Sequence, residues 1–356
     1  MFKNKRLGWT IVCLLLVTIL LTVAVQARPT VQVQGQGATA SIAATEAGQQ
    51  EVLKMWTREA RLAAKPMPMP AVSPAEPDQA DPQSLGKAGF TNGGAAQPSA
   101  DLKARRQFPE AWQGTGDEQL PDDIAGTPAI YTSYRVNSYA PMWKKYPFYT
   151  VGRLYFTTPS GNSYCTASVI SPNNIIVTAG HCLWGYGVGW YWNWSFVPAD
   201  RNGAAPYGSF PWASARVLPN WQNTGATRYD VAVITLGNNQ YGVPVTNYVG
   251  WLGRSWNWDY VQHHHAFGYP SNIMAGKYTY VCAAESFYGG DDVLGMGCDM
   301  TFGSSGGPWI RSFWPYAAVG DWVNSVVSGG TPGTNTFYGA RFSDFNIVPL
   351  CNDQGC

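Results

Sequence analysis

The chain has little charge. Only 13% of its 356 residues are charged, and 23 Lys and Arg nearly balance 22 Asp and Glu, which leaves a formal net charge of +1. Binding to nucleic acid or to an anionic membrane surface requires clustered basic side chains, because phosphates dominate both surfaces. We therefore expect neither of them as a partner.

Histidine is also scarce, and the sequence contains no C-x-x-C pair of the kind that binds zinc. Three of the four histidines are consecutive, His263 to His265. Alternate residues of a strand share a face, so only His263 and His265 would point the same way, with no third ligand nearby. We expect no metal site and no cofactor.

Residues 1–27 have the pattern of an export signal. Lys3, Lys5 and Arg6 precede an apolar stretch from Trp9 to Val25, and Ala27 supplies a small residue for cleavage. The apolar stretch approaches the length of about 18 residues that spans a bilayer, so an uncleaved signal anchor is the alternative. The cleaved form predicts a secreted protein without a stable membrane partner.

The chain has seven cysteines, of which Cys13 lies in the apolar stretch. An even number of cysteines in an exported chain indicates disulfides, and six cysteines allow about 15 connectivities. Sequential pairing is the simplest of them. It would join Cys165 to Cys182, Cys282 to Cys298, and Cys351 to Cys356.

Residues 28–125 are rich in Ala, Gln, Pro and Gly, and their composition predicts a largely disordered segment without a core of its own. Prolines alternate with methionines in residues 66–70, which favours an extended path. A helix is expected between Thr45 and Ala64, where Val52 and Trp56 recur at helical spacing. The segment is either a linker or, as we expect, a pro-segment that is removed near Arg105-Arg106 or in the stretch up to Thr127.

Residues 126–356 contain short apolar runs separated by turn residues and no long helical period, which predicts an all-β domain built as a sandwich or as one or two barrels. The expected strands include residues 151–156, 167–170, 175–178, 231–236 and 317–319.

A glycine-rich turn near residue 305 has the composition that a nucleophilic serine requires. Ser305 is followed by Gly306 and Gly307, and Gly303 precedes it by two positions. Glycines allow a tight turn and leave room for a substrate carbonyl beside backbone N–H groups. Ser304 is the alternative nucleophile, but no glycine pair follows it directly.

A serine nucleophile also needs a base and an acid that orients the base. His181 follows the apolar run 175–178 directly and precedes Cys182, whose disulfide would fix the local backbone. Asp230 opens the apolar run 231–236, where a carboxylate is costly unless it accepts a hydrogen bond. An ion pair with Arg228 is the alternative role for Asp230.

The block from Thr178 to Cys182, the aspartate before Val231 and the turn Gly303 to Pro308 together resemble the chymotrypsin-fold (trypsin-like) serine proteases, in the same chain order of His, Asp and Ser. Phe196-Val197-Pro198 and Gly268-Tyr269-Pro270 make the chain similar to the bacterial glutamyl endopeptidase (V8-like) branch. The resemblance implies two antiparallel six-stranded β-barrels with the active site in the cleft between them.

The resemblance also implies the site. His181, Asp230 and Ser305 would form the catalytic triad of a monomeric serine endopeptidase that acts on protein or peptide substrates through an acyl-enzyme. The N–H groups of Gly303 and Ser305 would form the oxyanion hole. Ser304 stands where trypsin-like enzymes have an acid directly before the nucleophile, so the activation switch that depends on this acid is absent. The pro-segment would therefore act differently, for instance by covering the cleft.

Substrate specificity is less determined. The resemblance places Asp299, Thr301 and Trp322 at the substrate pocket. Asp299 lies where trypsin-like enzymes keep an acid for Lys or Arg, whereas residues 319–323 lack the histidine with which glutamyl endopeptidases receive an acidic side chain.

An alternative function remains open at this point. The chain is rich in aromatic residues (14%), and Trp184, Trp190, Trp192 and Trp194 lie close together in sequence. A catalytically silent protease-fold protein could bind peptide or cell-surface glycan through such an aromatic surface. Packing below the loop that follows His181 is the other explanation for these tryptophans.

Overall fold

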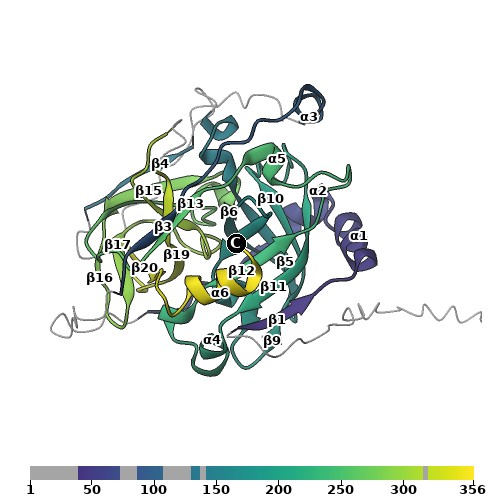
Figure 1. Cartoon of the computed structure of the whole chain (residues 1–356). Coiled ribbons are helices and arrows are strands. Elements are labelled where there is room, and N and C mark those ends of the chain that lie inside the picture. Colours follow the sequence, from purple (N-terminus) through teal and green to yellow (C-terminus); the bar gives the residue numbers. More distant parts are fainter. Residues whose placement is uncertain (1–38, 73–85, 107–129, 137–141, 316–319) are drawn as a thin grey trace, which may run out of the picture.

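The protein is built from two large β-sheets that lie side by side (Figure 1). The computed structural model describes residues 39–72, 86–106, 130–136, 142–315 and 320–356. The expected export signal, the strand at residues 317–319 and most of the expected cleavage region up to Thr127 lie outside these residues.

Six strands of the first sheet close into a barrel, because β11 pairs with β12 as well as with β10. All eight residues of the strand Val151–Thr158 are buried, as expected for a strand with protein on both faces. Around the barrel the strands are β11 (Phe210–Val217), β10 (Trp192–Pro198), β5 (Val151–Thr158), β6 (Gly161–Ser171), β7 (Ile175–Thr178) and β12 (Ala232–Leu236).

The second sheet curls but does not close. The strands β15 and β17, each next to an edge strand, face each other across the open side and do not pair within the described residues. In order, the sheet contains β16 (Phe287–Tyr288), β17 (Val293–Gly297), β20 (Thr336–Arg341), β19 (Trp322–Gly330), β18 (Pro308–Arg311), β14 (His263–Gly268), β15 (Tyr280–Glu285) and β4 (Thr132–Arg135), while β13 (Gly253–Trp256) pairs with β19 and with β3 (Gly89–Thr91).

The all-β chymotrypsin-like architecture is thus confirmed, with one correction to its detail. Only the first barrel is closed by six strands; the second is a curled half-barrel whose open side is bridged covalently. Cys282 on β15 is bonded to Cys298, which follows β17 directly. A disulfide therefore joins the two strands where ladder hydrogen bonds do not.

The described parts of residues 28–125 are folded, whereas the composition predicted a largely disordered segment. The strand β1 (Ala40–Ala43) extends the first sheet by pairing with β11, and β2 (Lys65–Pro66) pairs with β6. The segment has no core of its own, as expected. Instead it is ordered by the barrel, which supplies the partners.

The expected helix between Thr45 and Ala64 is divided in two. Thr45 is the N-cap of helix α1 (Glu46–Met55), and Thr57 is the N-cap of helix α2 (Arg58–Ala63). The Thr57 side chain accepts a hydrogen bond from the Ala60 N–H. Helix α1 therefore ends at Met55, and the cap at Thr57 starts a second helix instead of continuing the first. Trp56 lies between them, buried, and donates a 2.7 Å hydrogen bond from its indole to the Asn193 carbonyl.

The remaining elements are short. They are α3 (Ala100–Ala104), the two-stranded β8 (Trp184–Gly185) and β9 (Gly189–Trp190), α4 (Pro219–Thr224), α5 (Thr246–Val249) and the C-terminal α6 (Ile347–Gln354). No described helix combines the length and the apolar character that a bilayer span needs.

The six cysteines are paired sequentially. The disulfides join Cys165 to Cys182, Cys282 to Cys298 and Cys351 to Cys356. The disulfide Cys165–Cys182 links β6 to the residue after His181, and Cys351–Cys356 links helix α6 to the last residue of the chain.

The tryptophans near residue 190 pack against one another. The ring centroids of Trp184 and Trp190 lie 5.4 Å apart, those of Trp190 and Trp194 6.3 Å, and those of Trp194 and Trp212 5.0 Å, all with steep interplanar angles. Edge-to-face contacts of this kind stabilise a core. Trp194 is fully buried and belongs to the core, whereas Trp184, Trp190 and Trp192 are half-buried.

Asp321 is a carboxylate whose pKa is raised well above its ordinary value by the fold. Its side chain is buried, and burial raises its pKa to about 7, although a 2.9 Å hydrogen bond from the Trp314 N–H favours the charged form. Between about pH 4 and pH 7 the folded chain therefore holds a proton that the unfolded chain has lost. Stability must fall as the pH rises through this window.

We predict that Asp321→Asn stabilises the protein at pH 8 by about 1–3 kcal/mol and has a smaller effect at pH 4.5, because the amide carries no charge to bury. Thermal unfolding at the two pH values measures this, with Glu285→Gln as a control at an exposed carboxyl. An equal effect of Asp321→Asn at both pH values would contradict the assignment.

Candidate active site

The first barrel brings His181 and Asp230 together. His181 lies in a short 3-10 turn directly after β7, and Asp230 lies two residues before β12. Since β7 and β12 are antiparallel neighbours, with Thr178 opposite Ala232, the end of one lies beside the start of the other. The positions that the sequence analysis selected are therefore adjacent in space.

Asp230 holds His181 through two hydrogen bonds. Its Oδ2 lies 2.8 Å from His181 Nδ1, and its Oδ1 accepts a 2.7 Å bond from the His181 backbone N–H. Both residues are buried. Arg228 is not the partner of Asp230, because it forms a 2.6 Å ion pair with Asp291 instead. The ring orientation of His181 is fixed, and Nε2 remains as its second nitrogen.

Ser305 belongs to the second sheet, in the loop between β17 and β18. It is buried, and within the described residues neither its Oγ nor His181 Nε2 has a hydrogen-bond partner. Hydrogen bonds between a nucleophile and its base are commonly long without substrate and tighten when substrate binds. Both atoms are thus available for such a bond.

Ser304 faces a different environment. An added Cβ on Gly268 would lie 2.8 Å from both Cβ and Oγ of Ser304 and 2.9 Å from Met300 Sδ. The Ser304 side chain therefore packs against β14 and Met300 within the second sheet. Ser304 Oγ, like Ser305 Oγ, is buried without a hydrogen-bond partner among the described residues, so the contacts with β14 and Met300 are what distinguish the two serines.

Thr166 on β6 connects the first barrel to the serine turn, and the sequence analysis did not select it. Its N–H donates to the Ser305 carbonyl at 2.8 Å, and its hydroxyl donates to the Gly303 carbonyl at 2.9 Å. The same hydroxyl accepts a 3.1 Å bond from the Tyr269 N–H. Thr166 directly follows the half-cystine Cys165, but this position alone does not identify it from the sequence.

Glycine is required at two positions of the serine turn. Gly303 has φ +90°, and an added Cβ would lie 2.5 Å from Tyr164 Cε2 and 2.7 Å from the Tyr269 carbonyl. Gly306 has φ +79°, and its Cβ would overlap Thr178 Oγ1. A side chain at either position would be strained and would also clash with the first barrel.

The Gly303 N–H donates to a residue from the N-terminal segment. Its acceptor is the Met67 carbonyl, at 3.1 Å. Met67 belongs to a stretch, Lys65–Val72, that we call the strap. The strap begins on β6, where the Met67 N–H donates to the Tyr164 carbonyl at 2.9 Å, and ends on β19 at Gly330.

A cavity of about 350 Å³ lies beside this turn, with Met69 and Ala71 of the strap among its lining residues. Two of the three residues that were assigned to the substrate pocket, Asp299 and Thr301, line it. Trp322 does not, because it lies at the opposite end of β19 from Gly330, where its ring contacts Phe90 at 5.2 Å.

The other histidines do not form a metal site. His264 is buried, and its ring nitrogens lie 3.0 Å from Ser286 Oγ and 3.1 Å from Asn324 Oδ1. Burial lowers the pKa values of His264 and His265 to about 4, so both rings are neutral at ordinary pH. The two described groups of candidate ligands each consist of a disulfide with one neighbour, and their sulfurs are already bonded to each other.

The Trypsin family model matches residues 144–345, more than half of the chain. Among solved structures, the protease Anisep from Arthrobacter nicotinovorans is 30% identical, with a TM-score of 0.52, and the match covers 58% of this chain and 94% of that one. The thermostable serine protease AL20 from an extremophilic microorganism is 28% identical, with a TM-score of 0.53, over 58% of this chain and 97% of that one.

Curated relatives match over a shorter length. An extracellular metalloprotease of Bacillus subtilis is 30% identical over 30% of this chain and 33% of its own length. A glutamyl endopeptidase of Bacillus licheniformis is 33% identical over 26% of this chain and 27% of its own length. The chain thus matches about a third or less of each.

The chain belongs to the trypsin family, and it has the chymotrypsin-like fold of a peptidase, with a glutamyl endopeptidase among its relatives. The particular activity and the residues that carry it are taken up below.

We predict that Thr166→Val lowers kcat about tenfold or more with little change in KM. The substitution leaves the Gly303 carbonyl and the Tyr269 N–H unpaired in a buried site, at a cost of about 1–3 kcal/mol, while the size of the side chain is kept. Steady-state hydrolysis of a peptide substrate measures this. Thr166→Ser retains the hydroxyl and should restore most of kcat; equal losses in both variants would contradict the role of the hydroxyl.

Proposed function

We propose that the protein is a secreted serine endopeptidase in which Ser305 is the nucleophile, His181 the general base and Asp230 the residue that orients the base. The observation that carries the proposal is the pair of hydrogen bonds that Asp230 accepts from His181, at 2.8 Å from the ring Nδ1 and 2.7 Å from the backbone N–H, next to a buried serine turn. Family membership supports the peptidase class.

The chemistry follows from the groups present. His181 Nε2 accepts the proton of Ser305 Oγ as that oxygen attacks the substrate carbonyl, and then donates it to the leaving amine. In the second half of the reaction, His181 takes a proton from water as the water attacks the acyl-enzyme, and then returns a proton to Ser305 Oγ. Asp230 keeps Nδ1 protonated and stabilises the imidazolium that forms in each half.

The Gly303 N–H is one oxyanion donor, and the Ser305 N–H is the second that we propose. In the structure the Gly303 N–H already holds a carbonyl oxygen, that of Met67, at 3.1 Å. The donor is therefore oriented to bind a carbonyl before substrate arrives. Such a donor contributes about 3–4 kcal/mol to transition-state stabilisation.

Secretion is supported by the disulfides. Three disulfides in the chain fit an oxidising compartment and not a reducing cytosol.

The decisive test is the reaction of Ser305 with a fluorophosphonate probe. The wild-type protein should be labelled and should hydrolyse casein, and Ser305→Ala should do neither, while Ser304→Ala should retain both. Labelling of the Ser305→Ala variant would contradict the assignment. A folded wild-type chain that lacks residues 28–125 and still shows neither labelling nor hydrolysis would favour a non-catalytic binding protein.

We further propose that residues 28–125 are a pro-segment that inhibits the peptidase through the strap. The Met67 carbonyl occupies the oxyanion donor Gly303, and the next strap residues pair with β19. The Gly330 N–H donates to the Pro70 carbonyl at 3.1 Å, and the Val72 N–H donates to the Gly330 carbonyl at 3.1 Å. A substrate needs the same donor, so it and the strap exclude each other.

We predict that Met69→Asp increases the rate of fluorophosphonate labelling of the full-length chain about tenfold or more, because the cost of placing a carboxylate in the cavity weakens strap binding. The matched variant Met69→Leu should label at the wild-type rate. The same rate in all three proteins would contradict inhibition by the strap, and a mature N-terminus near Arg28 would contradict the removal of the segment.

A further inference from the structure

The cavity beside the serine turn has two protein walls and one wall formed by the strap. One protein wall is the loop Cys298–Phe302 ahead of Ser305, and the other is the turn Gly330–Phe337 between β19 and β20. Met69 and Ala71 of the strap complete it. The strap thus places two apolar side chains, and no polar one, at this cavity.

The lining of the cavity is mainly apolar. Met300 and Phe337 are buried at the cavity, and Phe302 is exposed by 46% of its surface at the same cavity. Two of the threonine hydroxyls donate hydrogen bonds to groups outside the lining, Thr301 to Asn272 Oδ1 at 2.6 Å and Thr331 to the Val72 carbonyl at 3.0 Å. The Thr301 hydroxyl is thus paired within the protease domain, whereas the Thr331 hydroxyl is paired with the strap and becomes free when the strap leaves. A single free hydroxyl does not compensate the burial of a full charge.

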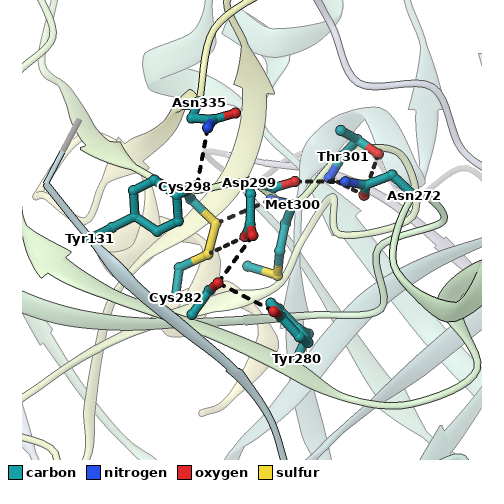
Figure 2. The surroundings of a disulfide bond; sticks show 10 residues. Tyr131, Asn272, Tyr280, Cys282, Cys298, Asp299, Met300, Thr301 and Asn335 are labelled. Carbon is teal, nitrogen blue, oxygen red and sulfur yellow. Dashed lines mark hydrogen bonds between the residues drawn. A yellow bond between two sulfur atoms is a disulfide. The ribbon is translucent and has the colours of Figure 1, made fainter. Parts of the chain in front are cut away.

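Asp299 is the charged residue of the described lining, and its carboxylate lies against the disulfide and β4 (Figure 2). Oδ2 accepts a 3.0 Å hydrogen bond from Ser133 Oγ, and Oδ1 lies 3.3 Å from Cys282 Sγ. The Asp299 backbone carbonyl accepts a bond from Asn272 at 2.8 Å. The Asp299 carboxylate therefore connects the loop after β17 to β4 and β15 at the open side of the second sheet.

Asn335 supplies the remaining polar group. Its Nδ2 donates to Tyr131 Oη at 3.0 Å, as Figure 2 shows, while its Oδ1 has no hydrogen-bond partner among the described residues. One acceptor at the cavity would suit a single amide donor. It would not compensate the burial of a full charge.

Gly330 sets the space that Met69 uses. Its main chain pairs with Pro70 and Val72, and an added Cβ would lie 3.6 Å from Met69 Cε and 3.5 Å from the Thr336 carbonyl. These are ordinary contact distances, and the φ of Gly330 is not left-handed, so the fold tolerates a side chain here. The side chain would extend toward the end of Met69.

We propose that this cavity receives the substrate side chain on the acyl side of the cleaved bond, that it selects a long apolar side chain such as that of Met or Leu, and that Gly330 determines its size. The inference rests on the proposed serine endopeptidase activity and specifies its substrate class. The strap is consistent with this choice, because the side chain that it places against the cavity beside Gly330 is the apolar Met69.

Charged side chains fit the cavity less well. An acidic side chain would meet no Lys, Arg or His in the described lining, and Asp299 would repel it. A basic side chain would need the Asp299 carboxylate, which is held by Ser133. An apolar side chain loses water without either cost.

The test is a series of peptides that differ only in this position, with Met, Leu, Ala, Gln, Glu, Lys and Arg, hydrolysed by the protein as it accumulates in culture medium. We expect kcat/KM for Met and Leu to exceed that for Glu, Lys and Arg at least tenfold. Residual strap competes equally with every peptide, so these ratios are unaffected. Highest activity on Glu, Lys, Arg or Gln would overturn the inference and leave the serine mechanism intact.

Two variants locate the determinant. Gly330→Val should lower the ratio of Met to Ala hydrolysis about tenfold, because two methyl groups fill the space of the Met terminus and one methylene in an apolar pocket changes kcat/KM about 10- to 200-fold. The matched control Glu285→Gln, at an exposed carboxyl outside the cavity lining, should leave the ratio of Met to Ala unchanged. Comparing ratios within one variant removes any effect of stability, and a Met to Ala ratio unchanged in Gly330→Val would overturn the role of Gly330.

A chain that hydrolyses none of the peptides would contradict the proposed function, and the pocket is then tested by binding alone. The Ser305→Ala protein is titrated with the free-acid peptides that end in Met and in Lys. At least tenfold tighter binding of the Met peptide supports the pocket assignment, and equal affinity overturns it.

Discussion

Two adjacent residues of one strand hold the candidate site together. Cys165 on β6 is bonded to Cys182 beside His181, and Thr166 binds the Ser305 and Gly303 carbonyls. Adjacent residues of a strand point to opposite faces, so one strand can reach toward its own barrel and toward the second sheet at once. The relative placement of base and nucleophile, which belong to different sheets, depends on this dipeptide.

The sequence predicted the parts of the site that depend on local chemistry. His181 and Asp230 were found because each adjoins an apolar run, and the structure places these runs as the neighbouring strands β7 and β12. Thr166 was not found, because a threonine within a strand has no local signature. Its role arises from contacts with residues far away in sequence, such as Gly303, which lies 137 positions further along the chain.

The fold was predicted to a similar depth. The strand at 175–178 has the expected bounds, and the disulfide partners are the sequential ones. What could not be predicted is the order in residues 39–72 and 86–106. Composition reports whether a segment can bury its own surface. It does not report that a barrel edge, such as β11 for Ala40–Ala43, is available to pair with it.

The alternating prolines of the strap have a mechanical consequence. Pro66, Pro68 and Pro70 carry no N–H and restrict the backbone to an extended path, so the strap loses little conformational freedom when it binds and gains little when it is released. We expect a stiff, preorganised segment of this kind to detach as a unit and not residue by residue. Under the proposed inhibition by the strap, activation would then behave as a threshold, set by whether the anchors at β6 and β19 are both in place.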